Sequence, residues 1–229
     1  MGAGRPKQYM DLCGYPVIYY SLKAFEDSFI DEIVLVCAAG DEEMCRNEIA
    51  ERYGFKKIKH IVCGGKERYH SVMNGVKAVG ADADHIFIHD GARPFVDKDI
   101  IERALHDVCE RKACVVGVPV KDTIKIASDD GYVDKTPKRA SVWQVQTPQV
   151  FEADLIRNAY AELEKREEEL AANGVEITDD AMIVELLMKQ RVFLTRGSYE
   201  NIKITTPEDL EYARWLVSKR GGGEHILKA

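Results

Sequence analysis

Short runs of apolar, mostly β-branched residues recur along the chain, with longer mixed segments between them. Five runs are predicted to be strands, over residues 33–37, 58–62, 85–89, 113–118 and 191–195. These runs are nearly continuous in apolar character, as expected for strands that are covered on both faces. The pattern therefore predicts a sheet that lies between two layers of helices.

The segments between the strands carry apolar residues at helical spacing. They predict helices over residues 16–25, 42–53, 68–79, 100–111 and 152–172, and a last helix that begins at Thr206. There Thr206 is a good N-cap, Pro207 fits the first helical position, and Asp209 can complete a capping box. Alternating strands and helices indicate an α/β fold with a mostly parallel sheet and helices on both faces.

One segment, over residues 121–145, breaks this alternation. It holds short alternating pieces (TIKIA, GYVDK, SVWQV) with turn signals at Asp129-Asp130-Gly131 and Thr136-Pro137. Three short strands between two α/β blocks predict a β-arm, at about residues 119–145, that projects from a single domain over residues 1–229. Because exposed strand edges often pack on another subunit, we expect a homodimer.

Composition narrows the class of protein further. The chain has 229 residues and 45% hydrophobic residues, enough for one domain with a sizeable core, and no apolar run is long enough to span a membrane. Lys+Arg 32 against Asp+Glu 39 gives a net charge of −7, so we expect neither a nucleic acid nor a membrane as partner. The six cysteines form no CxxC pair and match no zinc module, which favours a reduced, cytoplasmic protein.

Ligands of open α/β sheets bind at the carboxyl ends of the strands, so the residues that follow each strand are candidates for a site. After the second strand, Gly64 and Gly65 let the backbone approach a ligand closely, and a helix with free N–H groups then begins. Arg68 and Ser71 lie in its first turns. This segment alone is equally compatible with an ordinary strand-to-helix turn.

Charged residues follow other strands. Asp90 ends a buried strand, where its carboxylate suits Mg²⁺ bound together with phosphates, and Arg93 can form a fork on an anion. Lys203 is expected in a short strand between two isoleucines and would then point away from them, as a point charge for a phosphate. Near the start, Lys7 follows a proline that stiffens the segment. The alternative for each of these residues is a solvated charge or a surface ion pair.

Together these residues favour Mg²⁺-assisted attack on a phosphate. The chain has no G-x-S-x-G elbow for acyl transfer and no G-x-x-x-x-G-K-[ST] loop. No G-x-G-x-x-G follows a predicted strand, so a dinucleotide dehydrogenase is poorly supported.

Seven motifs in order make the chain resemble a known family. They are PKQY (6–9), GGKERYHSVMNG (64–75), HDGARP (89–94), PVKDTIK (119–125), WQVQTPQVF (143–151), TDDA (178–181) and NIKITTPEDL (201–210). The chain closely resembles the 2-C-methyl-D-erythritol 4-phosphate cytidylyltransferase family, over about residues 2–216. The nearest competitor is the sister family of ribitol-5-phosphate cytidylyltransferases, which shares several of these motifs.

The resemblance implies a Rossmann-like fold of the nucleotidyltransferase type. It also implies a reaction in which CTP and methylerythritol phosphate give the CDP-alcohol and pyrophosphate. Lys7 would neutralise the CTP phosphates, and Lys203 would contact the α-phosphate and align the attacking phosphate. The cytidine pocket would be lined by Gly64, Gly65, Arg68 and Ser71.

The other site residues implied by the resemblance concern the metal and the sugar phosphate. Asp90 would bind Mg²⁺ or orient the ligands, and Arg93 would help to hold the site. Thr123 and Arg139, on the arm, would reach the sugar phosphate of the neighbouring subunit's site, where Arg139 would be catalytic. Thr147 would contact the same substrate.

The chain departs from the family pattern at its start. Family members begin with an apolar strand and a loop of type A-x-G-x-G-x-R-M-G before Pro-Lys-Gln, and here Met1-Gly2 corresponds to the end of that loop. We therefore expect the family's first strand to be missing, and Arg5 is not assigned the role of the loop arginine. A chain that truly starts here is expected to show little cytidylyltransferase activity, whereas a shortened version of a normal enzyme would explain the same pattern. A third alternative is a non-catalytic dimer that keeps Arg93, Arg139 and Lys203 for a sugar phosphate.

Overall fold

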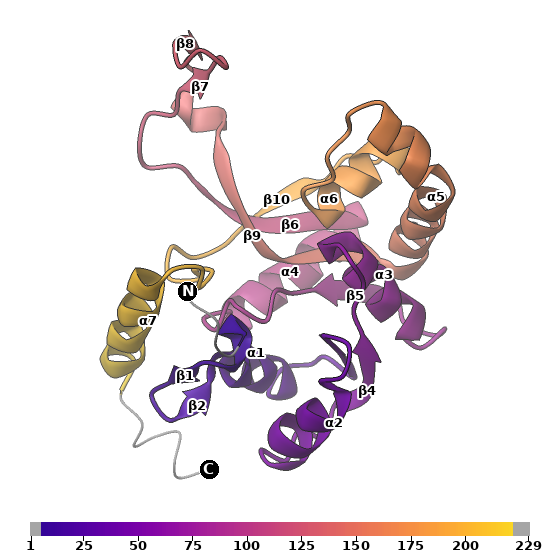
Figure 1. The fold of residues 1–229 in the computed structure, drawn as a ribbon, viewed down its shortest axis with the longest axis vertical. Helices are drawn as coiled ribbons and strands as arrows, with labels where there is room; N and C mark the ends of the chain where they lie inside the picture. Colours follow the sequence, from indigo (N-terminus) through magenta and orange to yellow (C-terminus); the bar gives the residue numbers. More distant parts are fainter. Residues whose placement is uncertain (1–5, 222–229) are drawn as a thin grey trace.

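The computed structural model describes residues 6–221 (Figure 1). Its strands are β1 (Asp11–Leu12), β2 (Tyr15–Pro16), β3 (Ile33–Cys37), β4 (Ile58–Cys63), β5 (His85–Ile88), β6 (Ala113–Pro119), β7 (Ile126–Ala127), β8 (Val133–Lys135), β9 (Trp143–Glu152) and β10 (Phe193–Arg196). Its α-helices are α1 (Val17–Glu26), α2 (Glu42–Met44), α3 (Arg68–Ala78), α4 (Lys98–Arg111), α5 (Ala153–Ala172), α6 (Asp180–Ile183) and α7 (Pro207–Lys219). Two 3₁₀ turns, η1 (Lys7–Tyr9) and η3 (Arg139–Ser141), and two π-helical segments, η2 (Cys45–Glu51) and η4 (Val184–Met188), complete the elements.

The predicted α/β class is confirmed, but the main sheet is mixed rather than mostly parallel. Its strand order is β10-β6-β9-β5, and β9 runs antiparallel to both of its neighbours, whereas β10 and β6 are parallel. The five predicted strands correspond to β3, β4, β5, β6 and β10. The sequence pattern missed most of β9 because Pro148 and several glutamines interrupt its apolar character.

Helices cover both faces of this sheet, as the continuous apolar runs indicated. Ala113 and Val115 of β6 pack in a cluster with residues of α5 and α6, while Cys114 and Val116 pack against α4. Because successive side chains of a strand point to opposite faces, one apolar run contributes to two cores. β3 and β4 pair parallel in a separate two-stranded sheet, which packs with α1 and η2.

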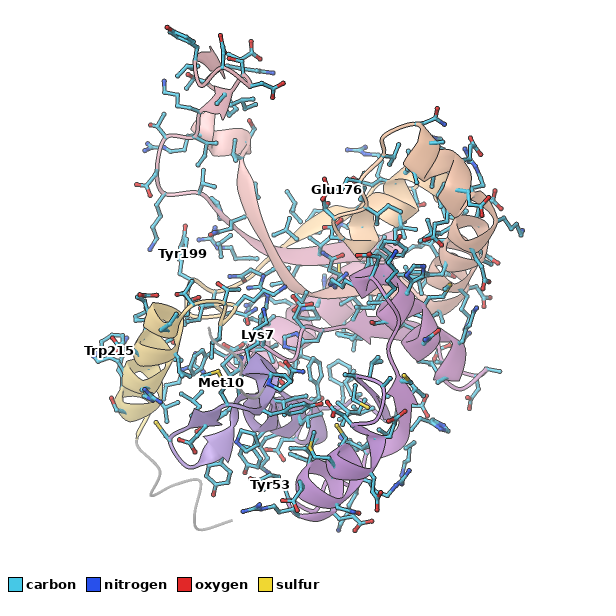
Figure 2. The ribbon with its side chains drawn as sticks, in the orientation of Figure 1. Lys7, Met10, Tyr53, Glu176, Tyr199 and Trp215 are labelled. Carbon is cyan, nitrogen blue, oxygen red and sulfur yellow. The ribbon has the colours of Figure 1, made fainter. Side chains whose placement is uncertain are left out.

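The β-arm projects from the body of the molecule (Figure 1). It holds the β7–β8 hairpin and η3, and its third predicted strand is the first part of β9, in which Gln144 pairs with Val118 of β6. Tyr199 lies between the arm and α7, and its hydroxyl donates to the Pro119 carbonyl over 2.8 Å (Figure 2). Three apolar side chains near the tip are solvent-exposed: Ile126, Tyr132 and Val133.

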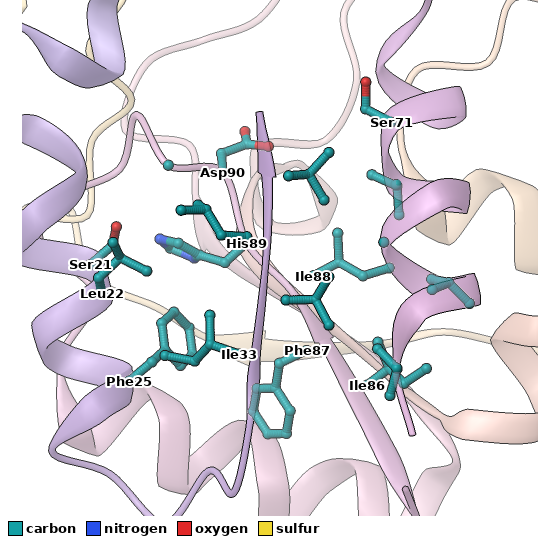
Figure 3. Close-up of a pocket in the computed structure, with 18 of the residues that line it drawn as sticks. Ser21, Leu22, Phe25, Ile33, Ser71, Ile86, Phe87, Ile88, His89 and Asp90 are labelled. Carbon is teal, nitrogen blue, oxygen red and sulfur yellow. The ribbon is translucent and has the colours of Figure 1, made fainter. Parts of the chain in front are cut away.

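A cavity of about 1310 Å³ lies between β3 and β5, which belong to different sheets (Figure 3). Residues of both strands, of α1 and of α3 line it. In residues 6–221 no strand pairs with the edges of β3 and β5 that line this cavity. Met1-Gly2 and Arg5, on which the expectation about the family's first loop rests, lie outside the described residues.

Within the part of the chain that the structure describes, the helices are either too short or too polar to cross a membrane.

Candidate active site

The carboxyl ends of β3, β4 and β5 open into this cavity, as the strand-end argument predicts. Cys37 ends β3, Gly64 follows β4, and Asp90 follows β5, and all three line the cavity. Figure 3 shows Asp90 and Ser71 at one end of the cavity, whereas Phe25 and Phe87 lie toward the other end. The end of the cavity at Asp90 and Ser71, which we call its mouth, is thus polar, and an apolar stretch with Phe25 and Phe87 lies away from it.

Three cations surround Asp90. The Lys203 ammonium lies 2.8 Å from its Oδ2, Arg68 Nε lies 3.3 Å from its Oδ1, and Arg93 Nε lies 3.9 Å from its Oδ2. Only 16% of the Asp90 side chain is exposed, so water screens these charges less than at an open surface, although Lys203 and Arg68 are partly exposed. Arg68 also contacts the buried Asp180 carboxylate over 2.8 Å, so three cations face two carboxylates, and the remaining excess of positive charge suits an anionic ligand.

The Asp90 carboxyl is ionised at neutral pH. Burial would raise its pKa, but Arg68 and Lys203 outweigh burial and lower the pKa to about 2. The fixed negative charge keeps Lys203 in place before any phosphate arrives.

A chain of hydrogen bonds fixes the backbone at Asp90. Its N–H donates to Thr147 Oγ1 over 3.1 Å, and Thr147 Oγ1 lies 3.1 Å from His89 Nδ1. Burial lowers the pKa of His89 to about 4, so the ring is neutral, and its Nε2–H donates to the Arg93 carbonyl over 3.1 Å. The Thr147 hydroxyl therefore donates to Nδ1 and accepts the Asp90 N–H, and its contact with the substrate stays a prediction.

Arg93 acts mainly as a clamp between segments. Its Nη1 donates to the Asn201 carbonyl over 3.0 Å and its Nη2 to the Val145 carbonyl over 3.5 Å. Among residues 6–221, its buried Nε finds no hydrogen-bond partner. The guanidinium thus links the segment before α7 to β9. Its Nε lies 3.9 Å from Asp90 Oδ2, so its positive charge also favours the ionised carboxylate.

Lys203 reaches the site although its predicted strand does not form. Residues 201–205 have no regular secondary structure, and the Ile204 N–H donates to the Ala92 carbonyl over 2.9 Å. Ile204 is completely buried, so its neighbour Lys203 is directed outward, onto Asp90. The predicted orientation is correct, and the predicted strand is wrong.

The glycine pair between β4 and α3 is required by close packing. Gly64 N–H donates to the Cys37 carbonyl over 2.7 Å, and a Cβ at Gly64 would lie 2.8 Å from Ser71 Oγ. A Cβ at Gly65 would overlap the Cβ of His70. Ser71 Oγ accepts the Gly65 N–H over 3.0 Å and so holds this loop against the first turns of α3.

The remaining predicted residues divide into two groups. Lys7, in η1, lines the same cavity as Asp90 and Lys203. Thr123 and Arg139 are exposed on the arm, where Arg139 Nη1 donates to the Lys121 carbonyl over 3.3 Å, and neither residue lines the cavity. A single chain therefore brings Arg68, Asp90 and Lys203 together, places Lys7 on the same cavity, and leaves the arm residues apart.

Asp180 belongs to this site and carried no role in the sequence analysis. Its side chain is completely buried, and its Oδ2 accepts from Arg68 Nη2 over 2.8 Å. The only signal in the sequence is the pair of aspartates in TDDA, which does not by itself indicate what they contact.

The donor set allows a divalent cation only together with a phosphate ligand. In the described residues no three His, Cys, Asp or Glu side chains gather as a metal site. Mg²⁺ is commonly held by one or two carboxylates while substrate phosphates and water supply the other ligands. Asp90 can provide that one carboxylate.

Comparisons with known proteins agree on one family. The sequence model of 2-C-methyl-D-erythritol 4-phosphate cytidylyltransferase matches residues 1–219. A protein of that name from Lachnoclostridium phytofermentans is 48% identical over 211 residues, which cover 92% of this chain and 88% of that protein. Its counterpart from Lachnospira eligens is 50% identical over 209 residues, or 91% of this chain and 89% of that protein. The crystal structure of a 4-diphosphocytidyl-2C-methyl-D-erythritol synthase from Anaerococcus prevotii superposes with a TM-score of 0.82, at 33% identity over 95% of this chain and 92% of that one.

Proposed function

The chain belongs to the 2-C-methyl-D-erythritol 4-phosphate cytidylyltransferase family, and from this we propose how its residues carry out the reaction. The enzyme transfers a cytidylyl group from CTP to 2-C-methyl-D-erythritol 4-phosphate and releases pyrophosphate, a step in isoprenoid precursor synthesis. The ribitol-phosphate alternative is not favoured, because the relatives carry the methylerythritol name. The observation that carries the residue roles is the group of three cations around Asp90.

The chemistry needs charge neutralisation more than proton transfer. An oxygen of the acceptor phosphate attacks the α-phosphorus of CTP, the new P–O bond forms, and the bond to the bridging oxygen breaks. Pyrophosphate leaves with that electron pair. Because the nucleophile is already an anion, no general base is required, and cations that hold two phosphates together supply most of the rate.

Lys203 and Lys7 are proposed as the catalytic cations. Lys203 would exchange Asp90 for the α-phosphate, because its ammonium already lies at the polar mouth of the cavity. Lys7 would contact the CTP phosphates from η1. The close-packed loop of Gly64 and Gly65 would approach the cytidine, and a side chain at either glycine would displace the loop, because its Cβ would meet Ser71 Oγ or the His70 Cβ.

Asp90 is proposed as the protein ligand of Mg²⁺, bound together with the CTP phosphates. When bound, the ion would neutralise phosphate charge and polarise the α-phosphorus. The protein's own contribution is to keep the Asp90 carboxylate ionised and its backbone fixed through Thr147.

The arm residues would act in the site of a second copy. Arg139 and Thr123 lie outside the cavity of their own chain, and the arm exposes apolar side chains that a second copy can cover. We therefore propose a homodimer in which each arm supplies Arg139 and Thr123 to the sugar phosphate bound by its partner. Arg93 would stabilise that site indirectly, through the clamp on residues 201–205.

A cytoplasmic location is also proposed. The six cysteines are free thiols, three of them buried, which suits a reducing compartment.

Pyrophosphate release is the direct test of this function. The protein would be incubated with CTP and Mg²⁺ together with methylerythritol phosphate, and, in a parallel reaction, with ribitol 5-phosphate. Release that requires both CTP and methylerythritol phosphate, and that is at least about tenfold slower with ATP or with the ribitol ester, is the expected result. Equal rates with both polyol phosphates, or no release with either, would contradict the proposal.

A further inference from the structure

The TDDA segment, residues 178–181, forms a buried junction between α6 and the active site. Asp179 is the N-cap of α6 and accepts from the Met182 N–H over 2.9 Å. The next residue, Asp180, has a side chain with no exposed surface. Such a carboxylate is costly to bury unless charges and hydrogen bonds compensate it.

Both oxygens of Asp180 are compensated, and one of them by an active-site residue. The Tyr160 hydroxyl donates to Oδ1 over 2.6 Å, and Arg68 Nη2 donates to Oδ2 over 2.8 Å. The same guanidinium reaches Asp90 Oδ1 through its Nε, over 3.3 Å. Arg68 therefore bridges two carboxylates, and its stronger contact is with Asp180 rather than with Asp90.

Asp180 is itself held by the strand that supports Asp90. Gln149 of β9, only 1% exposed, donates to Asp179 Oδ2 over 3.0 Å and accepts from the Ala181 N–H over 2.9 Å. Gln149 also pairs in register with Ile88, the last residue of β5. The position of Asp180 relative to Asp90 is thus set by the sheet and not by a flexible loop.

We propose that Asp180 is a positioning residue for the reaction. It holds the Arg68 guanidinium in a fixed orientation at the mouth of the cavity, where Arg68 contacts the nucleotide. An arginine that is ordered before the ligand binds loses less conformational freedom on binding. Asp180 also balances part of the Arg68 charge, so that Arg68 does not fold completely onto Asp90 and occupy both of its oxygens. This inference rests on the proposed role of Arg68 in the nucleotide site.

A double-mutant cycle tests whether Asp180 acts through Arg68. The wild type, D180N, R68Q and the double variant would be compared by kcat, by KM for CTP and by thermal midpoint. We expect each single substitution to lower kcat/KM for CTP by about tenfold or more, and D180N to change it by less than about threefold when R68Q is already present. Independent, multiplicative losses would overturn the proposal.

Tyr160→Phe is the matched control for a purely structural role. It removes a hydrogen bond to the same buried carboxylate but leaves the Arg68–Asp180 pair. We expect Y160F to lower the thermal midpoint while kcat/KM stays within about twofold of wild type. A kinetic loss in Y160F that matches the loss in D180N would overturn the proposal.

The outcomes also separate this inference from the proposed function. If R68Q leaves the kinetics unchanged, the role of Arg68 in the nucleotide site is wrong, and the positioning inference fails with it. If R68Q is impaired and D180N adds an independent loss, only the positioning inference fails. R68Q is the variant at risk of unfolding, because it leaves the fully buried Asp180 carboxylate without its cation, whereas in D180N Arg68 is partly exposed and still contacts Asp90. Should R68Q not fold, R68K takes its place in the cycle, because lysine keeps a cation but lacks the guanidinium fork that Asp180 orients. A change of less than about threefold on adding D180N to R68K supports the proposal, and a further loss of about tenfold contradicts it.

Discussion

The Lys203 ammonium lies 2.8 Å from Oδ2 of Asp90, so a cation from the irregular segment before α7 is held on the carboxylate that follows β5. This ion pair lies at the mouth of the cavity, where the phosphates of CTP would replace the carboxylate as the partner of Lys203. The pair therefore keeps a mobile side chain near the place where it is needed.

Replacing Lys203 by alanine should lower kcat by about 10²–10³-fold, because one preorganised charge at the transferring phosphorus is lost. Pyrophosphate release at saturating CTP and methylerythritol phosphate measures the effect. Lys219→Ala is the control. Lys219 is the last residue of α7, pairs with Glu200 over 3.3 Å and does not line the cavity. Similar losses in the two variants would contradict the role of Lys203.

The depressed pKa of Asp90 should make its contribution to stability depend on pH. Its carboxylate is favoured in the folded protein, so this stabilisation is complete above the ordinary pKa of 3.8 and is lost as the pH falls toward about 2. The shift corresponds to about 2 kcal/mol. Denaturant unfolding of wild type and D90N between pH 6 and pH 2 should show a difference in free energy that shrinks across this interval, and a difference independent of pH would contradict the assignment.

Strand positions were predictable because a strand that is buried on both faces needs a continuous run of apolar residues, which is visible in the sequence. Each continuous apolar run, such as 113–118, forms a strand whose alternate residues enter two different cores. Most of β9 has no such apolar run, because Gln146 and Gln149 are buried polar residues whose side chains hydrogen-bond to segments distant in the sequence. Their partners, Ser198 and Asp179, become visible only when the chain is folded.

The part of the candidate site that directly follows strands was predictable in the same way, and the part that depends on packing between distant segments was not. Asp90 and the glycine pair follow strands directly, so their place at the sheet edge follows from the order of elements along the chain. Asp180 could not be placed, because its contact with Arg68 depends on how α6 packs against β9. Thr147 accepts a hydrogen bond from the Asp90 N–H, a contact that the order of the elements along the chain does not indicate.

Replacing Gly65 by alanine should weaken nucleotide binding, because the new Cβ would overlap the His70 Cβ and displace the loop before α3. We expect KM for CTP to rise by about tenfold, with a smaller change in KM for the acceptor. Gly80→Ala is the matched control, since its Cβ would meet only the ends of two flexible side chains, Asp82 at 2.8 Å and Glu32 at 3.6 Å. An unchanged KM for CTP in G65A would show that the loop does not contact the nucleotide.

Replacing Arg139 by alanine should impair use of the sugar phosphate more than use of CTP, because Arg139 lies on the arm and outside the nucleotide cavity. We expect KM for methylerythritol phosphate to rise by about tenfold while KM for CTP stays within about twofold. Lys135→Ala removes another exposed cation of the arm, from β8, and should leave both values near wild type. Equal increases in both KM values for R139A would count against the assignment.

Mixed dimers distinguish an arm that acts on its partner's site from one that acts on its own. If R139A and K203A are combined in one dimer, one of the two sites receives Lys203 from one chain and Arg139 from the other and is intact, while the other site lacks both. At methylerythritol phosphate concentrations well below KM, the K203A parent is nearly inactive and the R139A parent keeps about a tenth of the wild-type rate. Random pairing makes half of the dimers mixed, so the mixture should recover to about a quarter of the wild-type rate, above the average of the two parents. If each arm instead served its own chain, both sites of the mixed dimer would carry one defect, and activity would stay at the level of the parents. Isolating the mixed dimer through two different tags, with its size checked by size-exclusion chromatography, removes both parents and should raise the activity to about half of wild type.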